Sequence, residues 1–299
     1  MVFSICKCKF MVFGFHHYAR SLKVIIFGAG VQGKKILNEV KEKYEVVLII
    51  DNDPQKNNIY IENILVKNLS KDILDETDFD AIIIGTLSGY KAIMRQLIKL
   101  GVPSTKIVTS WVELPTMARE KFVESLGILF ENNNILGSVA EGGVFQGEFA
   151  AIINKVFPDK KLYLFDTFEG FDERDIDKES NYSYAKSGDY SITSEEMVIK
   201  KMLFPEKVII KKGYFPNTTN GIEDLFCFVN LDFDLYNPTK RGLEWFSNRM
   251  VSGGIILVHD YFSSQYLGVK QAVDNFVEGR KDVRIIPIGD TISIAIIGF

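Results

Sequence analysis

Hydrophobic and polar positions follow the periods of strands and helices from residue 22 onward. Residues 23–30, KVIIFGAG, are typical of a buried strand that runs into a glycine turn, and the following VQGKKILNEVKEK has apolar residues at helical spacing. EVVLIIDNDP then reads as a second strand that ends in acidic residues. The alternation continues to residue 111 and predicts a small open parallel sheet with helices on its faces.

A second series of the same kind starts near residue 135. Its strands are almost continuous apolar runs, as parallel strands buried on both faces require, and VRIIPIG with TISIAIIGF predicts a terminal antiparallel hairpin. We therefore predict an α/β protein with two tandem Rossmann-like open sheets. The expected parts are an N-terminal extension at 1–20, a first domain at 21–114, a connecting helix at 115–126 and a second domain at 127–299.

Composition excludes several classes of function. A net charge of -4 gives no basic surface for nucleic acid. Residues 1–20 are apolar, but charged residues interrupt them well short of a membrane span, and no convincing signal-peptide cleavage site is present. The three cysteines suit neither a disulfide framework nor a four-ligand zinc site, which indicates a cytoplasmic location. Small-molecule chemistry remains the expectation, and a homo-oligomer stays open.

The first glycine turn has the spacing of a dinucleotide-binding motif. Gly28, Gly30 and Gly33 follow a strand and precede a helix, and Asp51 ends the next strand. Such glycines let the backbone approach a pyrophosphate, and the acid can accept ribose hydroxyls. NAD is one candidate ligand, although no Tyr-x-x-x-Lys pair follows to supply redox chemistry. A tight turn without any ligand explains the same residues.

The first domain resembles the N-terminal nucleotide-sugar-binding domains of bacterial sugar acyltransferases. FGAG, IDNDP, an IIIG strand and LGVPSTKIV carry this resemblance in the same order along the chain. It implies a nucleotide or nucleotide-sugar-binding module without catalysis of its own, with Gly28, Gly30, Gly33 and Asp51 at the matching positions.

The second series has its own turn and its own acids at strand ends. Glu141, Gly143 and Gly147 follow a strand and precede a helix, and Asp166 ends the next strand. Further along, Asp232 and Asp234 in VNLDFDLY, and His259 with Asp260 in LVHDY, end two more strands. Carboxyl ends of neighbouring parallel strands meet at the crevice where open sheets bind ligands, so we expect these side chains to converge. Capping of a neighbouring loop explains Asp234 equally well.

These motifs are similar to those of the macrocin and mycinamicin sugar O-methyltransferase family. EGGVFQGEFA, LYLFDTFEGF, KGYFPNT, LDFDLYNPT and GGIILVHDY carry the resemblance, which covers residues 127–299. It implies a class I methyltransferase fold that uses S-adenosylmethionine and magnesium to methylate a sugar hydroxyl. Glu141, Gly143 and Gly147 would then lie along the methionine and ribose of the cofactor, and Asp166 would hold the ribose hydroxyls. Asp232, His259 and Asp260 would occupy the metal-binding positions.

His259 departs from this family, whose strand ends Asp-Asp-Tyr where this chain has His-Asp-Tyr. Magnesium prefers oxygen ligands, whereas imidazole suits manganese, iron or zinc. Three outcomes are open: a softer metal, magnesium held by Asp232 and Asp260 with water, or no metal and His259 as the base. We expect Asp232 to be base and metal ligand, with His259 as the alternative base.

The resulting expectation is a methyltransferase acting on a sugar or nucleotide-linked sugar, assisted by magnesium or manganese. Two alternatives belong to other classes: an NAD-dependent sugar-nucleotide oxidoreductase, and a non-catalytic nucleotide-sugar sensor with a degenerate methyltransferase half. The polar and aromatic segment 173–194 reads as a lid. Its tyrosines, Tyr182, Tyr184 and Tyr190, are explained by local packing as well as by contact with a sugar.

Overall fold

The computed structural model describes residues 21–86, 89–179, 182–183 and 185–299. The expected extension at 1–20 and Tyr184 of the expected lid lie outside these residues. The chain divides into two compact units, and the boundary between them lies between Trp111 and Val112. The segment 115–126 is part of a longer helix, α4, which runs from Ser110 to Asn132.

The first unit is a six-stranded sheet within the described residues, in the order β3-β4-β2-β1-β5-β6. Only the short β3 runs antiparallel to its neighbour β4. In chain order the elements are β1 (Lys23–Phe27), α1 (Val31–Val40), β2 (Glu45–Asp51), η1 (Pro54–Lys56), β3 (Tyr60–Ile61), β4 (Ile64–Asn68), α2 (Lys71–Glu76), β5 (Ala81–Ile84), α3 (Tyr90–Lys99), η2 (Ser104–Lys106) and β6 (Ile107–Val108).

Burial on both faces of the central strands explains their apolar runs. Val24 and Ile26 of β1 pack with Ile36 and Leu37 of α1 on one face, and Ile25 on the other face is fully buried. The strand order reverses between β1 and β5, so the turn after β1 lies at the position where open sheets bind ligands.

The second unit is a seven-stranded sheet in the order β12-β13-β11-β10-β7-β8-β9, counted over the described residues. After α4 its elements are β7 (Ser138–Gly142), α5 (Glu148–Val156), β8 (Leu162–Asp166), α6 (Glu173–Glu179), α7 (Glu195–Ile199), η3 (Pro205–Lys207), β9 (Val208–Lys212), η4 (Asn217–Thr219), β10 (Phe226–Leu231), α8 (Tyr236–Ser247), β11 (Met250–Val258), α9 (Leu267–Val277), β12 (Arg284–Pro287) and β13 (Ile294–Ile297).

The predicted terminal hairpin is confirmed, because β12 and β13 pair antiparallel. The second strand of the hairpin, β13, inserts between β12 and β11 and also pairs antiparallel with β11. The other strands are parallel. These two largely parallel sheets with helices confirm the predicted α/β fold class.

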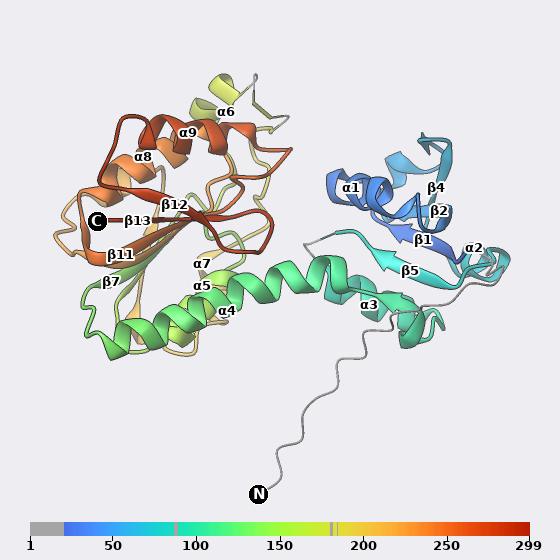
Figure 1. Ribbon diagram of the computed structural model, residues 1–299, viewed down its shortest axis with the longest axis horizontal. Helices are drawn as coiled ribbons and strands as arrows, with labels where there is room; N and C mark the ends of the chain where they lie inside the picture. The colour runs from blue at the N-terminus through green and yellow to red at the C-terminus, as the bar shows by residue number, and fades with distance from the viewer. Residues whose placement is uncertain (1–20, 87–88, 180–181, 184) are drawn as a thin grey trace, which may run out of the picture. The chain divides into compact units, whose positions relative to one another are not determined.

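Helices cover both faces of the second sheet (Figure 1). On one face α8 and α9 contribute Leu243, Phe246 and Val269 to a core with the strands. On the other face α4, α5 and α7 pack over the strands and contribute, among others, Val123 and Ile153. The strand order reverses at β7 and β10. Open sheets of this kind bind ligands at the carboxyl ends of the strands where the order reverses.

No helix in the described part of the chain combines the length and the apolar character needed to cross a membrane.

Candidate active site

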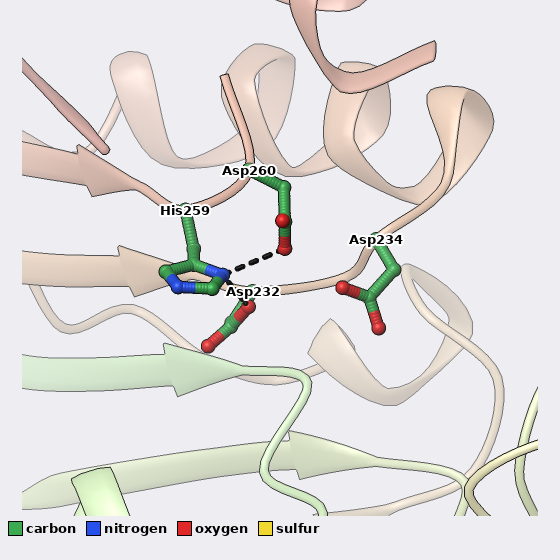
Figure 2. A group of neighbouring side chains, drawn as sticks. All are labelled: Asp232, Asp234, His259 and Asp260. Atoms are coloured by element: carbon green, nitrogen blue, oxygen red, sulfur yellow. Dashed lines mark hydrogen bonds and ion pairs between the residues drawn. The ribbon is translucent and has the colours of Figure 1, made fainter. Parts of the chain in front are cut away.

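The four polar side chains at the ends of β10 and β11 converge (Figure 2). Asp232, Asp234, His259 and Asp260 each offer a ligand atom, and these atoms all lie within 4.8 Å of one another. The strand pairing explains this, since Leu231 and Val258 are register partners and the chain segments that follow them stay side by side. The predicted convergence of strand-end acids is therefore present, and Asp234 is part of the cluster.

His259 lies between two carboxylates. Its Nδ1 atom is 2.8 Å from Oδ1 of Asp232 and 2.6 Å from Oδ2 of Asp260. Burial alone would lower the pKa of His259, but the two carboxylates outweigh burial and raise this pKa to about 9. At neutral pH the ring is therefore an imidazolium that neutralises part of the acidic cluster.

Asp234 and Asp260 have unusual backbone conformations. Their φ angles are 62° and 60°, in the left-handed region that residues other than glycine rarely adopt. Burial, together with the charges of Asp260 and Asp232, raises the pKa of Asp234 well above its ordinary value. Strained residues of this kind persist where the surrounding structure holds them, commonly at functional sites.

The turn after β7 passes directly against the acidic cluster. Gly143 has a φ of +81°, and a Cβ atom there would lie 2.0 Å from the carbonyl oxygen of Asp232. Gly147 has the same φ, and its Cβ would meet the side chain of Val198 at 2.9 Å. Both positions therefore require glycine for backbone and packing reasons, whether or not a ligand binds.

Asp166 holds this turn in place. Its Oδ2 atom accepts hydrogen bonds from the backbone amides of Val144 at 2.7 Å and Phe145 at 2.9 Å. Its Oδ1 atom accepts one from the amide of Phe168 at 2.7 Å. Since a carboxylate has about four acceptor positions, Asp166 keeps room for roughly one further donor.

The first unit repeats this arrangement. Asp51 accepts hydrogen bonds from the backbone amides of Ala29 and Asp53, both at 2.8 Å, and pairs with Lys56 at 3.1 Å. These partners lower the pKa of Asp51 despite the opposing effect of its burial.

The structural constraints that require glycine differ among the three glycines of the first turn. A Cβ on Gly33 would lie 1.8 Å from the carbonyl oxygen of Gly28, which itself has a φ of +118°. A Cβ on Gly30 would meet nothing within 4 Å. Packing therefore explains Gly28 and Gly33 but leaves Gly30 unexplained.

Glu141 is buried beside the cluster. It is 1% exposed, and its Oε1 atom accepts a hydrogen bond from Nδ2 of Asn230 at 2.9 Å. Burial and the nearby charge of Asp232 raise the pKa of Glu141 well above its ordinary value. The structure thus brings Glu141, Asp166 and the acidic cluster to one edge of the second sheet, and the first turn with Asp51 to the corresponding edge of the other sheet.

Sequence reasoning missed Arg119. This residue lies on α4, its Nη1 atom is 3.5 Å from Oδ2 of Asp232, and its guanidinium stacks 4.4 Å from the ring centre of Phe149. Arg119 and Asp232 are more than a hundred residues apart in the chain, and helical periodicity cannot predict such a contact. The sequence alone therefore did not indicate a role for Arg119.

Two tyrosines also border the cluster. The hydroxyl of Tyr190, from the expected lid, lies 3.0 Å from the hydroxyl of Tyr266, which precedes α9. Burial and the charge of Asp234 raise the pKa of both tyrosines. Tyr190 also packs edge-on against Phe145 of the glycine turn, so the segment that was expected to form a lid contacts that turn.

Solved structures of two O-methyltransferases are similar to this chain. CalS11, a calicheamicin methyltransferase, aligns over 70% of this chain and 92% of its own with a TM-score of 0.52 and 18% identity. The O-methyltransferase NovP aligns over 60% of this chain and 78% of its own, with a TM-score of 0.49 and 20% identity. A comparison with curated protein sequences found no match.

Two family models match the sequence. Residues 20–108 match the model described as C2185-like, N-terminal. Residues 118–290, more than half of the chain, match the macrocin-O-methyltransferase (TylF) model. The protein therefore belongs to the macrocin-O-methyltransferase (TylF) family.

Proposed function

We propose that the protein is an S-adenosylmethionine-dependent O-methyltransferase that methylates a hydroxyl of a sugar, free or linked to a nucleotide. The observation that carries this proposal is the contact between the second glycine turn and the acidic cluster, in which Gly143 packs on the backbone of Asp232. A methyl donor on the turn and a proton acceptor at the strand end would be neighbours. The sugar substrate is supported by family membership and by CalS11, a TDP-rhamnose 3'-O-methyltransferase.

The proposed cofactor contacts lie on the turn after β7 and at the end of β8. Glu141, Gly143 and Gly147 would border the methionine and ribose of S-adenosylmethionine. Asp166 would bind a ribose hydroxyl with its remaining acceptor position while its other bonds fix the turn. A pre-formed turn favours binding because less backbone must be ordered when the ligand arrives.

The chemistry requires a base beside the acceptor hydroxyl. S-adenosylmethionine, when bound, would supply a methyl group activated by its sulfonium, which would pass in line to the acceptor oxygen as the C–S bond breaks and sulfur keeps the electron pair. The hydroxyl proton must leave, and we assign Asp232 to accept it. Asp232 is partly exposed, and its Oδ1 and Oδ2 atoms face His259 and Arg119. His259 is the alternative base, but it must first lose the proton that its two carboxylate partners stabilise.

A divalent metal fits the same residues. Three carboxylates and an imidazole with ligand atoms within 4.8 Å of one another make a donor set that manganese accepts, and the carboxylates alone suit magnesium. We propose Asp232, His259 and Asp260 as the ligands, with Asp234 available as a fourth. Such an ion would stabilise the alkoxide form of a coordinated hydroxyl. Without a metal, the His259 imidazolium would supply the positive charge.

For the first unit we propose binding of a nucleotide or nucleotide sugar at the turn of Gly28, Gly30 and Gly33. The open space around Gly30 supports it, since packing gives no reason for glycine there. Asp51 would act as Asp166 does in the second unit, by fixing the turn and offering an oxygen to a ribose.

The matched acids Asp51 and Asp166 allow a paired test. The full-length protein is titrated calorimetrically with S-adenosylmethionine, NAD and a UDP-sugar, with and without magnesium or manganese. We expect Asp166→Asn to weaken binding of S-adenosylmethionine and Asp51→Asn to leave it unchanged. Failure of the wild type to bind S-adenosylmethionine would overturn the proposed function, and tight NAD binding alone would favour the oxidoreductase.

A further inference from the structure

The chain between β10 and α8 makes a strained turn that carries Asp234. The backbone amide of Leu235 donates a hydrogen bond to the carbonyl oxygen of Phe233 at 2.7 Å, which closes a three-residue γ-turn around Asp234. The φ of Asp234 is 62°, so this is the rare and strained form of the turn. Strained backbone persists only where the surrounding structure holds it, so the contacts on either side of the turn determine whether Asp234 stays in place.

Two hydrogen bonds hold this turn, one before it and one after it. Before the turn, the amide of Asp232 donates to the carbonyl oxygen of Gly142 at 2.8 Å. After the turn, the amide of Tyr236 donates to Oε1 of Glu179, the last residue of α6. The N-cap residue of α8, Leu235, makes no side-chain cap hydrogen bond, so Glu179 supplies this cap from a distant part of the chain.

Glu179 is buried where three helices meet. Helix α6 packs against α8 (Figure 1), and a Cβ atom on Gly268, in the first turn of α9, would lie 2.9 Å from Oε2 of Glu179. Oε2 has no hydrogen-bond partner among the described residues. Burial raises the pKa of Glu179 although the bond from Tyr236 opposes this shift, so the buried charge costs free energy. Stability alone is therefore a poor explanation for an acid at this position.

The segment after Glu179 contacts the same helix starts. The ring of Tyr182 stacks on the ring of Tyr236, with ring centres 5.6 Å apart. The carbonyl oxygen of Tyr182 accepts a hydrogen bond from the amide of Leu267, the first residue of α9, at 3.2 Å. These contacts fix the end of α6 against the starts of α8 and α9, so Glu179 is held in position to bind the amide of Tyr236.

We propose that Glu179 is a positioning residue for the acidic cluster: through the amide of Tyr236 it holds the strained turn that keeps the Asp234 carboxylate beside Asp232, His259 and Asp260. This inference rests on the proposed function, which assigns metal binding and proton transfer to that cluster. Without the bond to Glu179 the turn can relax, and the Asp234 carboxylate leaves the cluster. Metal affinity and the rate of methyl transfer should then fall, whereas the proposed cofactor contacts after β7 and β8 should be unaffected.

The experiment compares Glu179→Leu, which removes the acceptor, with Glu179→Gln, which keeps an acceptor for the amide of Tyr236. Calorimetric titration of the full-length protein measures the affinity for manganese alone and, separately, for S-adenosylhomocysteine, and single-turnover kinetics measure methyl transfer. We expect Glu179→Leu to weaken manganese binding and to slow methyl transfer about tenfold each, the lower end of the effect of residues that orient metal ligands. Glu179→Gln should remain close to wild type in both measurements, and neither variant should alter the affinity for S-adenosylhomocysteine.

A second pair of variants removes the other partner of the same hydrogen bond. Tyr236→Pro lacks the amide that Glu179 binds, and proline is favoured at the first position of a helix, which residue 236 occupies in α8. Tyr236→Ala is its control, because it also removes the ring but keeps the amide. We expect the loss of manganese affinity in Tyr236→Pro and not in Tyr236→Ala, with no further loss when Tyr236→Pro is combined with Glu179→Leu. Glu173→Leu, which removes an exposed carboxylate of the same helix, should change neither affinity nor rate.

Thermal unfolding of each variant establishes that it is folded, and the two Tyr236 variants carry the test if Glu179→Leu does not fold. Unchanged manganese affinity and rate in Glu179→Leu, or equal losses in Glu179→Leu and Glu179→Gln, would overturn the inference alone. A loss of S-adenosylhomocysteine affinity as large as that of manganese would do the same, because it would indicate a general structural role. A wild type that binds no S-adenosylhomocysteine would overturn the proposed function, and the manganese titrations would still decide the inference. If the wild type binds no manganese, the rates decide it, and a wild type that binds neither would overturn both.

Discussion

The Nδ1 atom of His259 lies 2.6 Å from Oδ2 of the next residue, Asp260. Two neighbours in a strand would point to opposite faces, but Asp260 follows the strand with a φ of 60°, and its side chain turns back toward the imidazole. The strand end therefore presents an ion pair between His259 and Asp260. Asp232, at the end of the neighbouring strand, pairs with the same imidazole. The substitution that separates this chain from the family pattern thus places a cation among the carboxylates.

The identity of residue 259 should set the metal preference. We expect His259→Asp, which restores the Asp-Asp-Tyr pattern, to bind magnesium roughly tenfold more tightly, the scale on which changes at a metal site alter affinity. His259→Asn is the control, since it removes the imidazole without adding a carboxylate. Calorimetric titration with magnesium and manganese measures both. Equal magnesium affinity in wild type and His259→Asp would argue against a metal at this position.

Asp232 should matter for turnover rather than for cofactor binding. We expect Asp232→Asn to reduce the rate of methyl transfer about 10²- to 10⁴-fold, the usual contribution of a general base. The affinity for S-adenosylmethionine should change little, because we assign Asp232 to the acceptor side. Single-turnover kinetics and calorimetry separate the two effects. A large loss of cofactor affinity at unchanged rate would refute the assignment.

Stability should depend on the protonation of Glu179. This carboxyl is 1% exposed, and burial is the main cause that raises its pKa from 4.5 to about 7. Because the folded-state pKa lies above the unfolded one, the neutral form stabilises the fold at low pH, and this contribution is lost as the pH rises through about 7. We expect Glu179→Gln to unfold at a higher temperature than wild type above pH 7, and the advantage to shrink toward pH 4.5.

Gln retains an acceptor for the backbone amide of Tyr236, which Glu179 binds at the start of α8. The comparison therefore isolates the charge. A stability difference that stays constant with pH would contradict the shifted pKa.

The hydroxyls of Tyr190 and Tyr266 should contribute to stability through one shared hydrogen bond. We expect Tyr190→Phe and Tyr266→Phe each to lower the free energy of unfolding by about 0.5–1.5 kcal/mol, the net value of a hydrogen bond. Because the two hydroxyl oxygens are 3.0 Å apart, the double variant should lose clearly less stability than the sum of the two single losses. Limited proteolysis near residues 185–194 reports the same attachment of the segment. Strictly additive losses would mean that the hydroxyls do not interact.

The sequence predicted the fold well because its strands are buried on both faces and its turns carry glycine. KVIIFGAG contains the whole of β1, whereas β11 begins at Met250, three residues before GGIILVHDY. The positive φ of Gly28 explains the break that follows β1. The insertion of β13 between β12 and β11 was not predicted, since periodicity reveals strands but not their order.

The sequence predicted the part of the candidate site whose geometry depends only on which residues end neighbouring strands. Asp232 and His259 converge because β10 and β11 are parallel neighbours. Side-chain direction could not be predicted, so the bonds from Asp51 and Asp166 to their own glycine turns emerged only from the structure. Arg119 was missed because its contact depends on how a helix packs across the sheet, which residue spacing does not encode.

The central claim is that this chain transfers a methyl group from S-adenosylmethionine to a sugar hydroxyl. The most direct measurement incubates the full-length protein with methyl-labelled S-adenosylmethionine, manganese or magnesium, and a panel of sugars and nucleotide sugars, and follows both S-adenosylhomocysteine and label on sugar oxygen. We expect stoichiometric formation of the two products with at least one acceptor, and their loss in Asp232→Asn. Binding of S-adenosylmethionine without either product across the panel would contradict the claim and favour a sensor.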